Sequence, residues 1–176
     1  MKTLKTTLKA WPLIASITVA LCFLTGVVSE YVFGVKLDNQ ASLEQVRSMI
    51  TWLVQRLCGN AGWHWYFFKD LFSLLWMLFW LVVLVPVLEE VVFRWLLWRL
   101  PRPKWPVISA VTSSALFSAA HYIQMPWPNN AFIALFFFGM AQCWLYRKTD
   151  RLWSPMLNHA LFNLTNLVLL FTFPEV

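Results

Sequence analysis

Pro86-Val-Leu-Glu-Glu-Val-Val-Phe-Arg94 places two adjacent carboxylates and an arginine inside a long apolar part of this chain. Residues 71–88 are almost wholly apolar, and apolar sequence resumes at Trp95. A charge at such a position costs at least about 2.5–3.5 kcal/mol on membrane insertion scales, so it is retained only where it is paired or needed for function. The stretch therefore predicts a functional site within a membrane helix.

Helix geometry separates the two glutamates of this stretch. Glu90 and Arg94 stand four residues apart, so they share one helix face and can form an ion pair. Glu89 is rotated about 140° from Arg94 on the same helix and points elsewhere. We therefore predict that Glu90 and Arg94 form a structural pair and that Glu89 is free for chemistry.

The composition excludes an ordinary soluble domain. The 176 residues are 60% hydrophobic and only 12% charged, whereas charged residues normally make up about a quarter of a soluble chain. An all-α, polytopic bundle of transmembrane helices is expected. The net charge of +6 is dispersed between apolar segments, which argues against a nucleic-acid partner. The three cysteines have no paired or metal-binding spacing and are interpreted as packing residues.

The apolar segments predict five spans and one amphipathic helix in a single membrane domain. Residues 1–65 would hold a retained first span and the amphipathic helix, and residues 66–176 a catalytic bundle in which Pro86 kinks or restarts the second span. Basic residues cluster in segments 1–9, 99–104 and 147–151. This predicts a multi-pass membrane protein with a cytoplasmic N-terminus. The expected spans cover residues 10–35, 66–100, 105–122, 131–146 and 152–173.

Three ionisable groups besides the pair fall inside the later spans. They are Glu89, His121 and His159, each on a different predicted helix, and Asn163 shares a face with His159. Counted from the basic loops at 1.5 Å per residue, His121 lies deeper (about 24 Å) than the others (about 12–18 Å). The third span must therefore be tilted or short if all four are to meet.

This set suits the hydrolysis of an acyl bond. Glu89 can act as a general base toward water, while Asn163 and one histidine can donate hydrogen bonds to the oxyanion of a tetrahedral intermediate. One carboxylate with two imidazoles can also bind zinc with an open coordination position, so Glu89, His121 and His159 are an alternative metal site. Each histidine could instead be a packing residue, and Asn163 a simple contact between helices.

Three motifs in this order resemble the CPBP family of intramembrane proteases. Glu89–Arg94 fits E-E-x-x-x-R, Phe117–His121 fits F-x-x-x-H and His159–Asn163 fits H-x-x-x-N. The family includes type II CAAX prenyl endopeptidases and bacteriocin-processing and self-immunity proteins. The resemblance implies that Glu89 and His121 activate water, that His159 and Asn163 stabilise the oxyanion, and that Glu90 and Arg94 brace the site. It spans about residues 66–173. The chain is similar to small bacterial relatives, which implies a location in a bacterial inner membrane.

The expected function is that of an intramembrane endopeptidase without a cofactor. Its substrate would be a membrane-anchored protein or peptide that carries a C-terminal sorting signal, a leader or a CAAX-like tail, cleaved in contact with the lipid bilayer. The family has been described both as metal-dependent and as metal-free glutamic proteases, so zinc is the alternative cofactor. The alternative functions are a non-catalytic self-immunity or membrane-binding factor and a metal or ion transporter.

Overall fold

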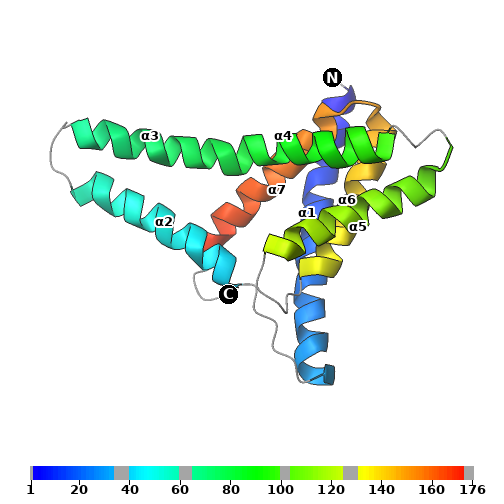
Figure 1. The fold of residues 1–176 in the computed structure, drawn as a ribbon, viewed down its shortest axis with the longest axis horizontal. Coiled ribbons are helices and arrows are strands. Elements are labelled where there is room, and N and C mark those ends of the chain that lie inside the picture. Colours follow the sequence, from blue (N-terminus) through cyan, green and yellow to red (C-terminus); the bar gives the residue numbers. More distant parts are fainter. Residues whose placement is uncertain (1, 34–39, 60–64, 100–103, 125–130, 173–176) are drawn as a thin grey trace.

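The computed structural model describes residues 2–33, 40–59, 65–99, 104–124 and 131–172. These residues are almost wholly helical and contain no strand, which confirms the all-helical prediction. Parts of the predicted amphipathic segment (36–39 and 60–64) and of the predicted loops (100–103 and 125–130) lie outside the described residues. The helices, drawn in Figure 1, are α1 (Lys2–Phe33), α2 (Gln40–Gly59), α3 (Trp65–Phe79), η1 (Trp80–Leu84), α4 (Val85–Glu90), η2 (Val91–Arg99), α5 (Pro106–Gln124), α6 (Ala131–Thr149) and α7 (Trp153–Thr172).

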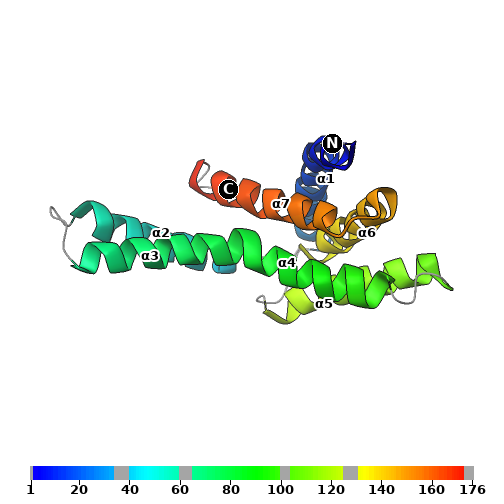
Figure 2. The ribbon, with the colours of Figure 1, turned by 90° about the horizontal axis from the view of Figure 1, so that it is seen from above.

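One continuous helix carries the sequence from α3 to η2. The backbone stays helical through both junctions, with φ −68° and ψ −46° at Leu84 and φ −62° and ψ −49° at Val91. What changes is the hydrogen bonding, because η1 and η2 are π-helical turns, with bonds between residues five apart. The chain accommodates Pro86 by this widening, and the restart that the sequence suggested does not occur (Figures 1 and 2).

Helices α5, α6 and α7 contact this long helix, and α1 packs against α6 and α7. In Figures 1 and 2, α1 and α6 run alongside each other, α5 passes obliquely beneath the long helix, and α7 lies obliquely beside it. Gly139 of α6 lets α5 approach closely, since an added Cβ would lie 3.0 Å from Ser114 Cβ. Phe117, Phe138 and Leu145 fill the core between these elements. Functional side chains on α4, α5 and α7 can therefore meet at one crossing point.

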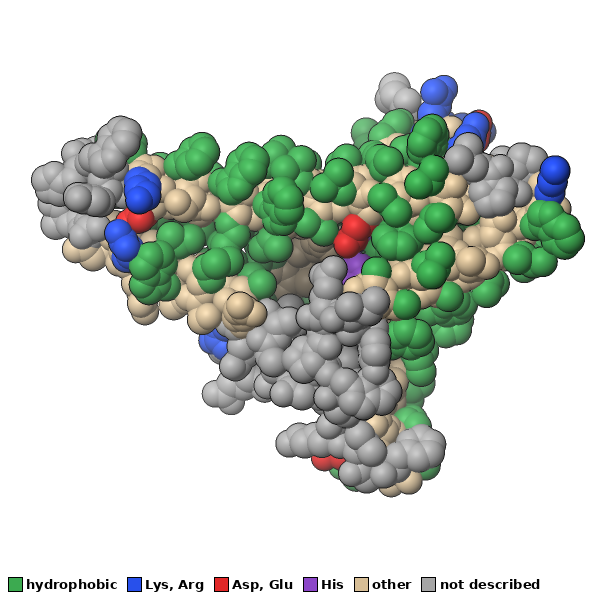
Figure 3. Space-filling view, in the orientation of Figure 1, with side chains coloured by type: hydrophobic (Ala, Val, Ile, Leu, Met, Phe, Trp, Pro, Cys, Tyr) green, Lys and Arg blue, Asp and Glu red, His purple; other side chains and the backbone are tan. Residues whose placement is uncertain are grey.

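The outer surface is apolar to an extent that suits lipid rather than water. Hydrophobic side chains cover the view in Figure 3, and Phe72 of α3, for example, is 67% exposed. Among the described residues, two helices are long and apolar enough to cross a membrane, Lys2–Val32 and Phe67–Arg99. Helices α5, α6 and α7 occupy the other predicted span segments, but five spans and their orientation stay predictions, as does the division of the chain at residue 65.

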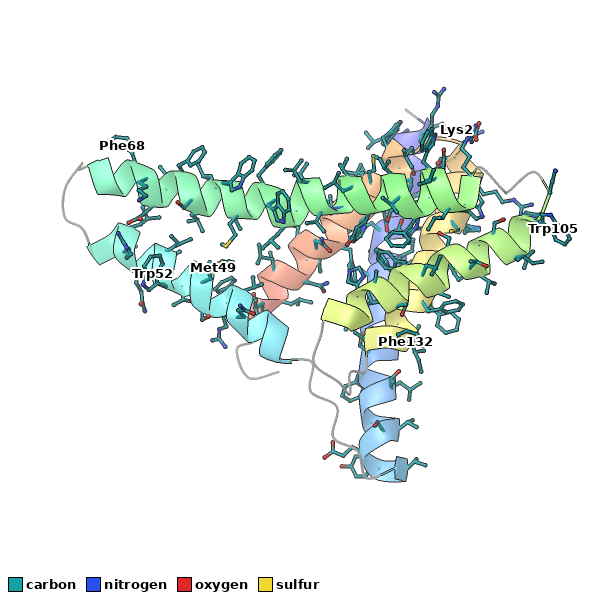
Figure 4. All side chains as sticks on the ribbon, viewed as in Figure 1. Lys2, Met49, Trp52, Phe68, Trp105 and Phe132 are labelled. Carbon is teal, nitrogen blue, oxygen red and sulfur yellow. The ribbon has the colours of Figure 1, made fainter. Side chains whose placement is uncertain are left out.

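The predicted amphipathic segment forms α2, which pairs with α3 as a helical hairpin. Ile50 and Leu53 are buried, whereas Met49 and Trp52 project from the hairpin (Figure 4). The Arg56 Nε donates to Asp70 Oδ2 across the hairpin at 2.9 Å. The hairpin meets α7 at the end remote from its turn.

Candidate active site

The three isolated ionisable groups predicted from the sequence come together. Glu89 of α4 lies with its Oε1 3.6 Å from Nε2 of His121 on α5, and with its Oε2 3.6 Å from Nε2 of His159 on α7. The side chains of Glu89 and His121 are 22% and 21% exposed. Figure 3 shows an acidic side chain and a histidine side by side at the surface below α4. The site is thus open on one side.

Hydrogen bonds fix how the two imidazoles face Glu89. His121 Nδ1 lies 3.0 Å from the Phe117 carbonyl, and His159 Nδ1 lies 2.9 Å from Glu90 Oε1. Both partners are acceptors, so each Nδ1 carries the proton and donates it. In the neutral rings each Nε2 then presents a lone pair toward Glu89. At 3.6 Å these contacts are longer than hydrogen bonds, and a small molecule can lie within about 2.8 Å of both atoms of such a pair.

Glu89 Oε2, which lies 3.6 Å from His159 Nε2, lacks a hydrogen-bond donor in the described part of the chain. The atom is buried and accepts no hydrogen bond from any described residue. Buried carboxylate oxygens normally have a donor. Either a water molecule or a protonated imidazole can supply one between Glu89 and His159. The arrangement is suited to holding water against a base.

Behind the open group lies a fully buried ion pair. Glu90 Oε2 is 3.1 Å from Arg94 Nε, and both side chains are 0% exposed, which confirms the predicted pairing. The other oxygen of Glu90 accepts the hydrogen bond from His159. Glu90 therefore links the arginine to the imidazole, a connection that the local sequence did not reveal.

Phe117 packs the site together from α5. Its ring lies 4.6 Å from the His121 ring and 5.8 Å from the His159 ring, centroid to centroid, and 4.4 Å from the Arg94 guanidinium carbon. A cation above an aromatic face is attracted by the ring quadrupole, which compensates part of the cost of burying Arg94. Phe138 contacts the other side of His159 at 5.1 Å. Phe117, the first residue of the F-x-x-x-H motif, thus packs against both histidines and the arginine.

A comparison with known protein families shows to which family the chain belongs. Residues 71–165, just over half of the chain, match the family model described as type II CAAX prenyl endopeptidase Rce1-like. The chain belongs to this family. Members of the Rce1-like family are membrane-embedded proteases, so the resemblance drawn from the motifs is confirmed at this level. No curated protein and no solved structure matches the chain.

Asn163 follows His159 by one turn of α7 and lies on the same side. Its Nδ2 donates to the Leu81 carbonyl of η1 at 2.9 Å. One of its two N–H groups is therefore engaged with the long helix, and the amide has a second N–H. The structure brings Asn163 to the helix that carries Glu89, as the sequence suggested, and adds a backbone partner for it.

The alternative metal site can be tested against the same geometry. Glu89, His121 and His159 have the donor types of a catalytic zinc site. Among the residues that the structure describes, however, no group of three or more His, Cys, Asp or Glu side chains is arranged to hold a metal ion. The choice between a metal-free and a zinc-dependent reaction stays a prediction.

Two further features escaped the sequence analysis, a buried pair of amide side chains and an open apolar pocket. Gln142 of α6 donates to Asn158 of α7 at 2.9 Å, and both side chains are fully buried. Asn158 directly precedes His159 in the sequence. An apolar cavity of about 440 Å³ lies between α2 and α7, lined by Ile50, Thr51, Val54, Gln55 and Phe171. These lining residues carry no group for hydrolysis, so the cavity is separate from the reacting groups.

Proposed function

We propose that this chain is an intramembrane endopeptidase of the glutamic type, with water activated by Glu89. The main support for this proposal is that Glu89 faces the Nε2 atoms of both His121 and His159 at 3.6 Å, beside an open surface. A substrate peptide carbonyl brought to that surface would meet water already placed against a base.

The proposed reaction needs only groups of this chain and one water. Glu89, assisted by His121, takes a proton from the water as its oxygen bonds to the peptide carbonyl carbon. The carbonyl oxygen becomes an oxyanion, which the second N–H of Asn163 and a protonated His159 stabilise. Glu90 accepts the Nδ1–H bond of His159 and so holds the ring with its Nε2 toward the reacting groups. The intermediate then collapses, and Glu89 returns the proton to the leaving amine.

The proposed substrate is a membrane-anchored protein or peptide. Its cleaved segment would be a C-terminal sorting signal, a leader or a CAAX-like tail. The apolar outer surface and the long helix that carries Glu89 support a substrate that reaches the site from the bilayer. A panel of lipid-anchored peptides with each kind of tail, in vesicles that contain the purified protein, would identify which is cleaved.

The decisive experiment replaces Glu89 by glutamine. Glu89→Gln keeps the size of the side chain but removes the base, so cleavage should fall about 10²- to 10⁴-fold while the protein remains folded. Glu30→Gln is the matched control, because Glu30 lies exposed on α1, away from the site. Unaltered cleavage by Glu89→Gln would end the catalytic assignment. Substrate binding without cleavage by the wild-type protein would instead favour a non-catalytic role.

A further inference from the structure

The carbonyl of Leu81 has no donor within its own helix. In a helix it would receive a hydrogen bond from the N–H of residue 85 in the α pattern or of residue 86 in the π pattern. The N–H of Val85 is directed to the Trp80 carbonyl instead. Residue 86 is proline and has no N–H to give. The Leu81 carbonyl is thus exposed to partners from outside the helix.

Asn163 of α7 fills this position, 82 residues away in the chain. Its Nδ2 lies 2.9 Å from the Leu81 oxygen. Because the partner is a carbonyl, the NH₂ end of the amide must face it, so the orientation of the whole amide group is determined. An N–H at position 86 could pair with the Leu81 carbonyl in the π pattern and would then compete with Asn163 for it.

We propose that Pro86 is a positioning residue that orients Asn163 by leaving the Leu81 carbonyl without a helical donor. The bond is the second link between α7 and the long helix, one turn along α7 from the bond between His159 and Glu90. Together the two links fix both the rotation and the axial position of α7 against the segment that bears Glu89. This inference deepens the proposed function, and only its kinetic part rests on that function.

The test is a double-mutant cycle on stability. Asn163→Ala should increase the unfolding equilibrium constant about 3- to 20-fold, the range of hydrogen bonds between membrane helices. Pro86→Ala supplies an N–H at position 86 that can pair with Leu81. In that background Asn163→Ala should change the constant by less than about twofold. The constants are measured by reversible unfolding in mixed detergent micelles.

Two controls separate the missing N–H from other effects of the substitutions. Asn166→Ala removes the same side chain from the same helix, and Asn166 makes no hydrogen bond to a described residue. Its effect should be equal in both backgrounds. Incorporating lactic acid at position 86, the ester analogue of alanine, removes the proline ring without supplying an N–H. In this background Asn163→Ala should keep its full 3- to 20-fold effect.

Activity of the same variants tests the kinetic part. Pro86→Ala should lower kcat about tenfold and leave KM within about twofold, because the amide is no longer aligned. Equal effects of Asn163→Ala in both backgrounds would overturn the proposal, whatever the activity. Coupling in stability together with an unchanged kcat for Asn163→Ala would support the link and overturn the oxyanion role of Asn163. The two failures are therefore distinguishable, and Pro86→Leu repeats the cycle should Pro86→Ala not fold.

Discussion

Replacing Arg94 by methionine should lower the free energy of unfolding, because the buried carboxylate of Glu90 loses its ion-pair partner. Arg94 and Glu90 are both 0% exposed and 3.1 Å apart, so Arg94→Met leaves Glu90 buried with a single partner, His159. Removing one member of a buried pair typically costs about 3–5 kcal/mol. That figure contains the loss of the contact with Phe117, which is worth up to about 2 kcal/mol in a desolvated site.

The double variant Glu90→Gln, Arg94→Met isolates the cause of this loss. No charge remains buried, and the glutamine oxygen can still accept the hydrogen bond from His159. Replacing both members of a buried pair is often neutral or stabilising, so the double variant should recover at least about 1–3 kcal/mol, the part not due to the Phe117 contact. Reversible unfolding in mixed micelles gives each free energy. Arg99→Met is the control, because the exposed pair of Arg99 and Asp150 should contribute no more than about 1 kcal/mol.

The outcome that refutes this reasoning is equal destabilisation of the single and double variants. The cost would then come from lost packing around the guanidinium and not from an unpaired carboxylate. A loss of activity in the double variant with restored stability would be compatible with the reasoning. It would show that the carboxylate of Glu90 is needed to orient His159.

Three further predictions concern the packing and the cofactor. Gly139→Ala should destabilise the protein by about 1–3 kcal/mol, because the new Cβ meets Ser114 at 3.0 Å; adding Ser114→Gly, which removes Ser114 Cβ and Oγ, should recover part of this free energy. Thr7→Val should cost about 0.5–1.5 kcal/mol through loss of the buried 2.6 Å hydrogen bond to Ser154, and an unchanged unfolding midpoint would contradict that role. Cleavage by the purified protein should persist after treatment with EDTA or 1,10-phenanthroline; loss of activity that returns on adding zinc would instead establish the metal-dependent mechanism.

Interactions within one helix could be read from the sequence. The pair of Glu90 and Arg94 forms because residues four apart share a face of any α-helical turn, whatever surrounds it. The separation of Glu89 from this pair follows from the same rotation per residue. The apolar runs predicted helices at α1, at α5 to α7 and along the long helix, since an apolar segment must satisfy its own backbone groups. The three motifs identified the family.

Interactions between helices required the tertiary structure. His159 reaches Glu90 across 69 residues, and the depth estimate that separated His121 from Glu89 assumed parallel helices, whereas α5 crosses the long helix obliquely (Figure 1). The sequence identified Pro86 as a disturbance but did not show that the helix widens rather than breaks. The sequence by itself thus determined the helices, the family and the local ion pair, because these depend on residues close in the chain. Only the tertiary structure decided which side chain each buried polar group meets, because that depends on the crossing angle, rotation and axial offset of helices that no local spacing fixes.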